Sequence, residues 1–215
     1  WYGIMQGIPW TRDEAGDLLV GEDGNYIASQ DIGVIGNPNP QFTTNILSSM
    51  SFAGFSFNMQ WSYQHRGDIY SITTATMLAR GNTVDTDFDR FLPVILPGTR
   101  ATTEAENNIQ GYAGDFFFNA YFFADEGAVF DATNLRMREI SLSYSVPKSI
   151  MEKLPIGSLS ISLIGENMWF RAFNFPEGVN FAPEVLSLGV GTGRGFDVLT
   201  GPAARRYGGN ISLTF

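Results

Sequence analysis

The sequence has no cysteine, a single histidine and few charged residues. Without cysteine there are no disulfides and no thiolate metal sites, and one histidine excludes a metal centre built from several histidines. Charged residues make up 16% of the chain, against about 25% in an average soluble domain. The net charge of −9 argues against nucleic acid, which binds clustered lysine and arginine. No apolar run reaches the roughly 18 residues of a transmembrane helix.

Glycine and phenylalanine are abundant instead, with 24 and 18 copies, and serine, threonine and asparagine supply a neutral polar surface. This composition favours strands over long helices, so the predicted fold class is all-β. The carboxylates between the strands form no pair at a spacing that suggests catalysis. We therefore predict no enzyme activity, no catalytic residues, no metal site and no cofactor.

Five segments alternate between apolar and polar residues, which is typical of strands with two different faces. The clearest is Phe55–Arg66, where aromatic residues and methionine alternate with serine, asparagine and glutamine. A tight Ala53–Gly54 turn is predicted to join it to the preceding strand. In the third segment, Leu135–Val146, the alternation between apolar and polar residues changes phase near Arg138 and Glu139, as it would at a β-bulge or where a strand leaves the apolar layer. The other four segments are Phe42–Phe52, Leu135–Val146, Leu159 to about Phe170, and about Ala204 to Phe215.

The connections between these strands are alternately short and long, as in an up-and-down barrel of the outer membrane. Five strands are too few to close a barrel, which needs about eight, and open edges in lipid are costly. The prediction is a transmembrane antiparallel β-barrel of which this chain, beginning at Trp1 without a methionine, supplies the last five strands. Its expected organisation is external loop 1–40, hairpin 41–66, long external loop 67–133, hairpin 134–170, external loop 171–203 and closing strand 204–215.

In such a barrel the polar residues of each strand face the lumen and the apolar residues face lipid. The candidate lumen-lining residues are Ser56, Asn58, Gln60, Ser62, Gln64, Ser141, Ser143 and Ser145.

Several motifs occur in the order found in one known family. They are IGNPNPQF (35–42), RGDIY (66–70), RFLPVILPG (90–98), the long stretch 134–170 with its Pro-Lys turn and Gly-Glu-Asn ending, and the closing segment 195–215. From about residue 30 onward the chain resembles the SusC/RagA family of TonB-dependent outer-membrane transporters of Bacteroidetes. The resemblance implies a barrel of about 22 strands around an N-terminal plug that this chain lacks. It also implies a SusD-like surface lipoprotein as partner, TonB acting through the missing N-terminal part, and import of an oligosaccharide or peptide.

The last residues alternate up to an aromatic end. Outer-membrane proteins that resemble this chain finish with a signal that the barrel-assembly machinery recognises, with an aromatic last residue and apolar residues two, four and eight places before it. The matching positions are Phe215, Leu213, Ile211 and Tyr207.

One segment of the long loop is dense in aromatic residues. We expect it to pack within its own loop, with contact to the partner lipoprotein or a sugar as the second interpretation. Its residues are Phe116, Phe117, Phe118, Tyr121, Phe122 and Phe123.

Two other functions fit the strand pattern. One is a soluble β-sandwich module that binds glycans or mediates adhesion, in which the apolar faces pack on each other. The other is a SusC-like barrel that serves as a structural subunit of another outer-membrane complex.

Overall fold

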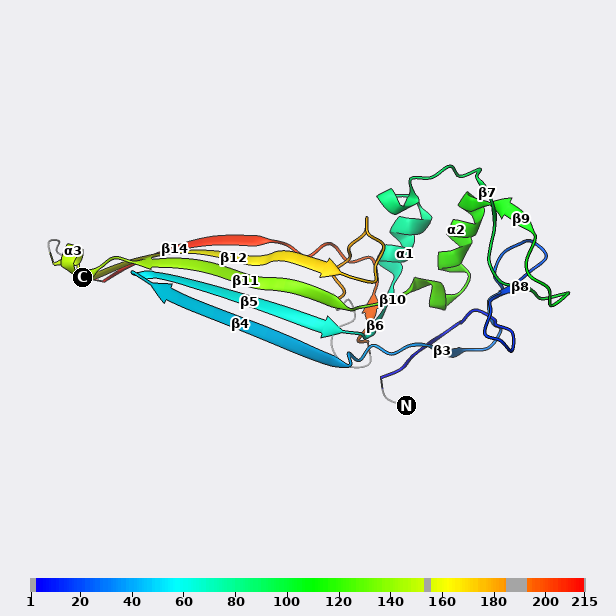
Figure 1. The fold of residues 1–215 in the computed structure, drawn as a ribbon, viewed down its shortest axis with the longest axis horizontal. Coiled ribbons are helices and arrows are strands. Elements are labelled where there is room, and N and C mark those ends of the chain that lie inside the picture. Colours follow the sequence, from blue (N-terminus) through cyan, green and yellow to red (C-terminus); the bar gives the residue numbers. More distant parts are fainter. Residues whose placement is uncertain (1–2, 153–155, 185–192, 215) are drawn as a thin grey trace.

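The computed structural model describes residues 3–152, 156–184 and 193–214. The chain is mostly β-strand with a few short helices. An elongated sheet runs along the molecule, and smaller elements gather at one of its ends (Figure 1). In chain order the elements are β1 Met5–Gly7, β2 Leu19–Val20, β3 Gly33–Gly36, β4 Phe42–Phe52, β5 Phe55–His65, β6 Asp68–Ser71, α1 Ile72–Ala79, η1 Val84–Thr86, β7 Pro93–Ile95, β8 Thr99–Arg100, β9 Gln110–Tyr112, α2 Ala113–Phe122, η2 Asp125–Ala128, β10 Val129–Asp131, β11 Asn134–Ser145, α3 Lys148–Met151, β12 Ser158–Ala172, β13 Phe196–Asp197 and β14 Arg206–Thr214.

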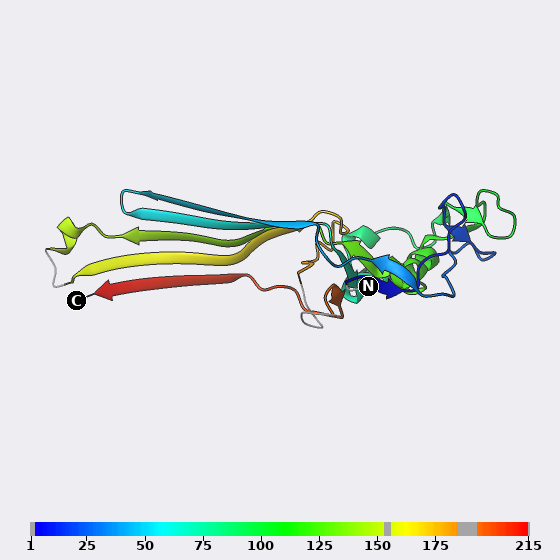
Figure 2. The same ribbon diagram turned by 90° about the horizontal axis from the view of Figure 1, so that it is seen from below.

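The elongated sheet has five strands in the order β14-β12-β11-β5-β4. Every neighbouring pair is antiparallel, and the five alternating segments of the sequence form these five strands. β4 and β14 are the two edges of an open sheet. Figure 2 shows the strands side by side along the length of the molecule. No helix within the described ranges is long and apolar enough to cross a membrane.

The turn between β4 and β5 has the geometry that its two residues allow. Ala53 and Gly54 have φ angles of 49° and 85°, and Phe52 pairs directly with Phe55. Two positive φ angles are typical of the type I′ turn, which matches the twist of a two-residue hairpin. Glycine adopts this conformation readily, whereas alanine is strained there.

The phase slip in β11 is a β-bulge. The register of β11 shifts between Met137 and Glu139 against both of its neighbours, β5 and β12. Arg138 is the extra residue, so the apolar face is formed by odd-numbered residues up to Met137 and by even-numbered residues from Ile140 onward. Of the two explanations considered from the sequence, the bulge is therefore correct.

The connections at the two ends of the sheet differ in size. The Ala53–Gly54 turn, helix α3 and the end of β14 lie together at one end (Figure 1). The long connections all lie at the other end, where they fold into a compact unit that we call the cap, formed by residues 3–41, 66–133, 173–184 and 193–205 (Figures 1 and 2). The long segments are thus folded structures with strands and helices of their own.

A small apolar core joins the cap to the end of the sheet. Phe175 stacks between Phe130 and Phe181, with ring centroids 5.0 and 5.9 Å away. Ile69 on β6 and Ala172 at the end of β12 complete this buried cluster. The core therefore joins residues from three segments that are distant in the sequence.

Helix α1 begins at a buried polar network. The Ser71 hydroxyl accepts a hydrogen bond from the Thr74 amide at 3.1 Å, which caps the helix. The same hydroxyl donates to Asp197 Oδ2 at 2.7 Å, and Thr200 donates to the other carboxylate oxygen. Asp197 is fully buried. Its hydrogen bond from Ser71 therefore connects strand β13 to the end of β6 and the start of α1.

The N-terminal segment is held by two carboxylates of η2. Asp125 accepts from the Ile8 amide at 2.8 Å and from the Tyr70 hydroxyl at 3.2 Å. Burial raises the pKa of Tyr70 to about 12, and the nearby Asp125 charge adds to the shift. Glu126 accepts from the Trp10 amide and forms an ion pair with Arg12 at 2.5 Å. Burial raises the pKa of Glu126, but the contacts with Arg12 and the Trp10 amide outweigh this and leave the pKa below its usual range.

Candidate functional site

The polar face of the five-stranded sheet carries the residues that we expected to line a lumen. On β5 they pair with residues of β11 on the same face, so that Gln60 is opposite Glu139 and Asn58 is opposite Ser141. Asn58 links three strands, because Ser49 donates to its side-chain oxygen at 2.7 Å and its amide nitrogen donates to Ser141 at 3.3 Å. The register brings together all the expected residues, Ser56, Asn58, Gln60, Ser62, Gln64, Ser141, Ser143 and Ser145.

The opposite face of the sheet is apolar and uncovered. Phe52 is 85% exposed, Leu163 62% and Ile211 66%, and no second sheet packs on this face within the described part of the chain. The apolar residues of the C-terminal strand belong to it, since Ile211 pairs with Ile161 and Leu213 with Leu159. Tyr207 shares this parity, whereas Phe215 lies outside the described residues.

Aromatic side chains gather at two levels of the apolar face. Near the turn end, Phe55 and Tyr144 lie 4.5 Å apart between ring centroids. Near the cap end, Trp61 meets Trp169 edge-on at 6.0 Å. Phe42, Tyr63 and His65 continue this second row, and the Tyr63 hydroxyl lies 3.2 Å from His65 Nδ1. The middle of the face, between the two rows, carries mainly aliphatic and methionine side chains.

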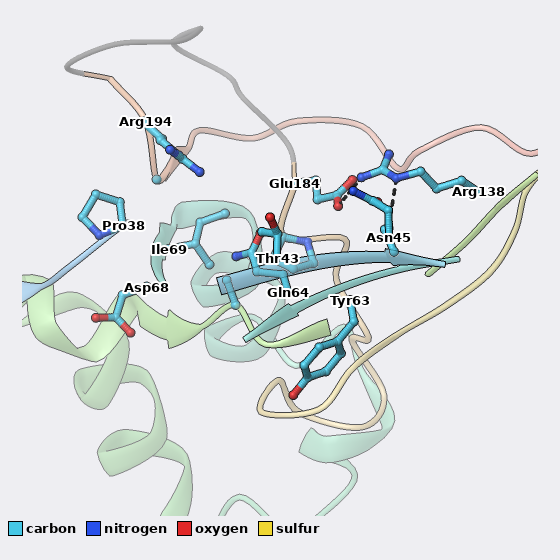
Figure 3. A pocket seen from close by; sticks show the side chains of 14 residues that line it. Pro38, Thr43, Asn45, Tyr63, Gln64, Asp68, Ile69, Arg138, Glu184 and Arg194 are labelled. Carbon is cyan, nitrogen blue, oxygen red and sulfur yellow. Dashed lines mark hydrogen bonds and ion pairs between the residues drawn. The ribbon is translucent and has the colours of Figure 1, made fainter. Parts of the chain in front are cut away.

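A pocket of about 440 Å³ lies where the polar face meets the cap (Figure 3). Its floor is formed by polar side chains of β4 and β5, including Thr43, Asn45 and Gln64. Its rim contains Arg138 on the β11 bulge and two residues of the 173–205 connection, Glu184 and Arg194. The pocket thus combines the strand residues expected from the sequence with cap residues that were not expected.

An ion-pair network forms one wall of this pocket. Glu184 binds Arg138 at 2.6 Å through one carboxylate oxygen and Arg136 at 3.1 Å through the other. Arg138 also donates from Nε to Ser62 at 2.9 Å. The Arg136 side chain is only 8% exposed and lies over the Phe170 ring at 5.6 Å. Glu184 therefore balances two guanidinium groups, one of them buried.

The sequence contained one signal for this network. The phase slip at Arg138 marked a bulge, and bulges often redirect a side chain next to a functional site. Nothing in the sequence around Glu184 or Arg194 pointed to the pocket, because the segment that carries them lacks periodicity.

The aromatic-rich segment forms helix α2, and its side chains have two different environments. Phe116 is 5% exposed, and Phe117 packs edge-on against Phe88 and Tyr121 at 5.2 and 5.3 Å. These inner rings border an apolar pocket of about 280 Å³. Phe118 and Phe122 lie 5.2 Å apart on the outside of the helix. Together with Phe123, they are exposed.

The chain was compared with family models, with curated proteins and with solved structures. No family model matches the chain. It is 22% identical to TonB-dependent receptor P3 of Formosa agariphila over 187 residues, covering 77% of this chain and 16% of the relative. The matched relative is thus several times longer than the part that this chain represents.

Two solved structures share the fold. A chain in the structure of the RagAB peptide transporter aligns with all of this chain and 23% of its own length, with a TM-score of 0.57 and 15% identity. The RagAB peptide importer in its open-open state aligns with 99% of this chain and 22% of its own, with a TM-score of 0.52 and 14% identity. These proteins are receptors and transporters, not enzymes. The resemblance expected from the sequence is confirmed: the chain is similar to part of a TonB-dependent transporter of the SusC/RagA type.

Proposed function

We propose that this chain forms the C-terminal part of the β-barrel of an outer-membrane importer for glycans or peptides. The observation that carries the proposal is the five-stranded sheet with one polar face and one uncovered apolar face. In water, an apolar surface of this size would be covered by a partner or by a second sheet. In a bilayer, the same face is solvated by lipid and the polar face lines an aqueous lumen.

The dimensions of the sheet support this placement. β4 and β5 each have 11 residues, and a tilted transmembrane strand needs about 9–11. Aromatic residues collect at the two interfaces of a bilayer, and the two aromatic rows of the apolar face are separated along β5 in this way. The Ala53–Gly54 turn and α3 would then be periplasmic, and the cap would be extracellular.

The two open edges call for further strands. Unpaired amides and carbonyls of β4 and β14 would each cost several kcal/mol in lipid. In the proposed barrel of about 22 strands, β4 pairs with a strand from an earlier part of the protein and β14 pairs with the first strand. Tyr207, Ile211, Leu213 and Phe215 act as the C-terminal signal for barrel assembly.

The proposed partners follow from the relatives. A SusD-like lipoprotein lies over the cap, with Phe118 and Phe122 of α2 and the adjacent Phe123 as contacts, and TonB supplies energy through the N-terminal part of the full protein. The exposed α2 rings support the lipoprotein contact because they sit on the cap, away from the sheet (Figure 1). Phe116, Phe117 and Tyr121 are less suited to it because they pack inside the cap.

The proposed orientation is tested with nitroxide labels on adjacent residues of β5. Asn58→Cys and Met59→Cys are introduced into the full-length protein, with any other cysteine replaced, and each labelled variant is reconstituted in lipid. We expect the label at position 59 to be accessible to molecular oxygen and the label at position 58 to a water-soluble nickel complex. A protein that stays in buffer without detergent, with position 59 shielded from both reagents, would instead be a β-sandwich.

Import itself is tested by uptake. Cells that lack the protein, and cells that lack TonB, are compared with the parent strain for uptake of fluorescent peptides and oligosaccharides. Loss of uptake of the same compound in both strains supports import. Unchanged uptake, combined with loss of another outer-membrane complex, would assign a structural role.

A further inference from the structure

We propose that the pocket between the polar face and the cap binds the carboxylate of an imported substrate, with Arg194 as the cation that receives it. This inference rests on the proposed import function and adds a chemical class of substrate to it. The pocket lies at the cap end of the polar face, where a substrate entering the proposed lumen from the cap side first meets the strands.

The pocket lining contains two arginines, Arg138 and Arg194, and two carboxylates, Glu184 and Asp68, and the buried Arg136 behind this wall brings the local charges to three positive and two negative. Arg138 and the buried Arg136 share a single carboxylate, that of Glu184. Arg194 is exposed at the rim and has no ion-pair partner among the described residues. The other acidic residue of the lining, Asp68, accepts a hydrogen bond from the Asn37 amide at 2.7 Å. This local excess is unusual in a chain whose net charge is −9.

The position of the two arginines suits an anionic group. In Figure 3, Arg194 and Arg138 lie on opposite sides of the pocket, with Gln64 and Thr43 between them on the strands. Arg138 is held in place by its bonds to Glu184 and Ser62, whereas the guanidinium of Arg194 forms no ion pair with any residue in the described part of the chain. A guanidinium binds a carboxylate through two parallel hydrogen bonds, which gives both affinity and orientation.

The remaining walls have both apolar and polar character. Pro38, Ile69, Ala132 and Pro183 contribute apolar surface to the lining, and β4 and β5 contribute amide and hydroxyl groups. This combination fits the end of a short peptide, in which a carboxylate is attached to an apolar side chain and to backbone amides. An acidic sugar offers the same carboxylate without the apolar group, so the peptide end is the better fit.

The experiment compares matched ligands on the purified full-length protein. N-acetyl-trileucine is used as the free acid and as the C-terminal amide, and trigalacturonate is compared with its methyl ester. Affinities are measured by calorimetry for the wild type, for Arg194→Gln, and for the control Arg206→Gln. Arg206 is a surface arginine on β14, outside the pocket, with its side chain 76% exposed.

We expect the wild type and Arg206→Gln to bind the free acid at least about tenfold more tightly than the amide, since a hydrogen bond to a charged group contributes roughly 1.5–3 kcal/mol. Arg194→Gln should bind the two forms about equally. A preference for trigalacturonate over its ester, lost in Arg194→Gln, would keep the carboxylate site and identify the acidic sugar as its source. Equal binding of acid and amide by the wild type, or an undiminished preference in Arg194→Gln, would overturn the inference. If the inference fails but the spin-label accessibilities and the loss of uptake are as expected above, the proposed import function still holds.

Discussion

Arg138 and Glu184 are 46 positions apart in the sequence, yet their side chains meet at 2.6 Å between Nη2 and Oε1. This ion pair joins the bulge of a central strand to the connection between β12 and β14. It exists because the bulge turns Arg138 toward Ser62 and the pocket, and because the connection folds back over the end of the sheet. Because Glu184 pairs with both Arg136 and Arg138, its loss would break both ion pairs of the proposed site.

Replacing Glu184 should loosen this junction. Glu184→Gln leaves the buried Arg136 without a counter-charge, which typically costs about 3 kcal/mol or more. We expect faster hydrogen exchange of backbone amides in β11 next to the bulge and at the end of the 173–184 segment. The matched control is Glu177→Gln, since Glu177 is 83% exposed and lies 3.6 Å from Arg171; an exposed pair contributes at most about 1 kcal/mol. Equal protection in both variants would show that the network does not stabilise the junction.

From the geometry of the β4–β5 turn we expect two adjacent substitutions to change the stability of the protein in opposite directions. Ala53→Asn should raise the urea midpoint of the folded full-length protein, because asparagine adopts positive φ with less strain, a gain of up to about 1 kcal/mol. Gly54→Ala should lower the midpoint, since the added Cβ would lie 2.8 Å from the Ser145 carbonyl oxygen at a φ of +85°. If both variants unfold at the wild-type urea concentration, the turn does not limit stability.

The N-terminal segment around residues 8–12 should detach from the rest of the cap at acidic pH. The folded pKa of Glu126 is below its usual range, so its contribution to stability is full above the unfolded pKa. That contribution is lost as the pH falls through the folded pKa. Limited proteolysis after residues 8–12 should therefore increase on acidification, and less so in Glu126→Gln, which lacks the titrating group. Cleavage that rises equally with acid in both proteins would assign the effect to other carboxylates.

The two sides of helix α2 should respond differently to substitution. Phe116→Ala removes a buried ring and should destabilise the cap by about 3 kcal/mol. The double variant Phe118→Ser with Phe122→Ser changes exposed rings only, so unfolding should shift by about 0.5 kcal/mol or less per site. If these rings contact the proposed lipoprotein, the double variant should lose co-purification of that partner while folding normally. Retention of the partner would place its contact elsewhere on the cap.

The sheet could be predicted from the sequence because its signal is local. The period-two alternation around Phe55–His65 and Arg206–Thr214, the Ala53–Gly54 turn and the phase slip at Arg138 each depend on a few consecutive residues. The alternation also assigned every expected polar residue to one face, since a strand leaves only two choices.

The cap could not be predicted in this way. Helix α2 begins after Tyr112 without a side-chain cap and consists largely of aromatic residues, which are weak helix formers. The helix is stabilised by burying Phe116 and by packing Phe117 against Phe88 and Tyr121. Those neighbours are defined by tertiary structure, and local propensity does not reveal them.

The sequence by itself thus determined the strands and their two faces, because residue spacing along a short segment encodes them, and its local motifs carried the family resemblance. Only the tertiary structure decided that the long connections fold into one cap, that Glu184 meets Arg136 and Arg138, and that Arg194 borders a pocket over the polar face. The physical reason is that these contacts join residues from segments with no periodicity of their own, and their positions follow from which surfaces pack together.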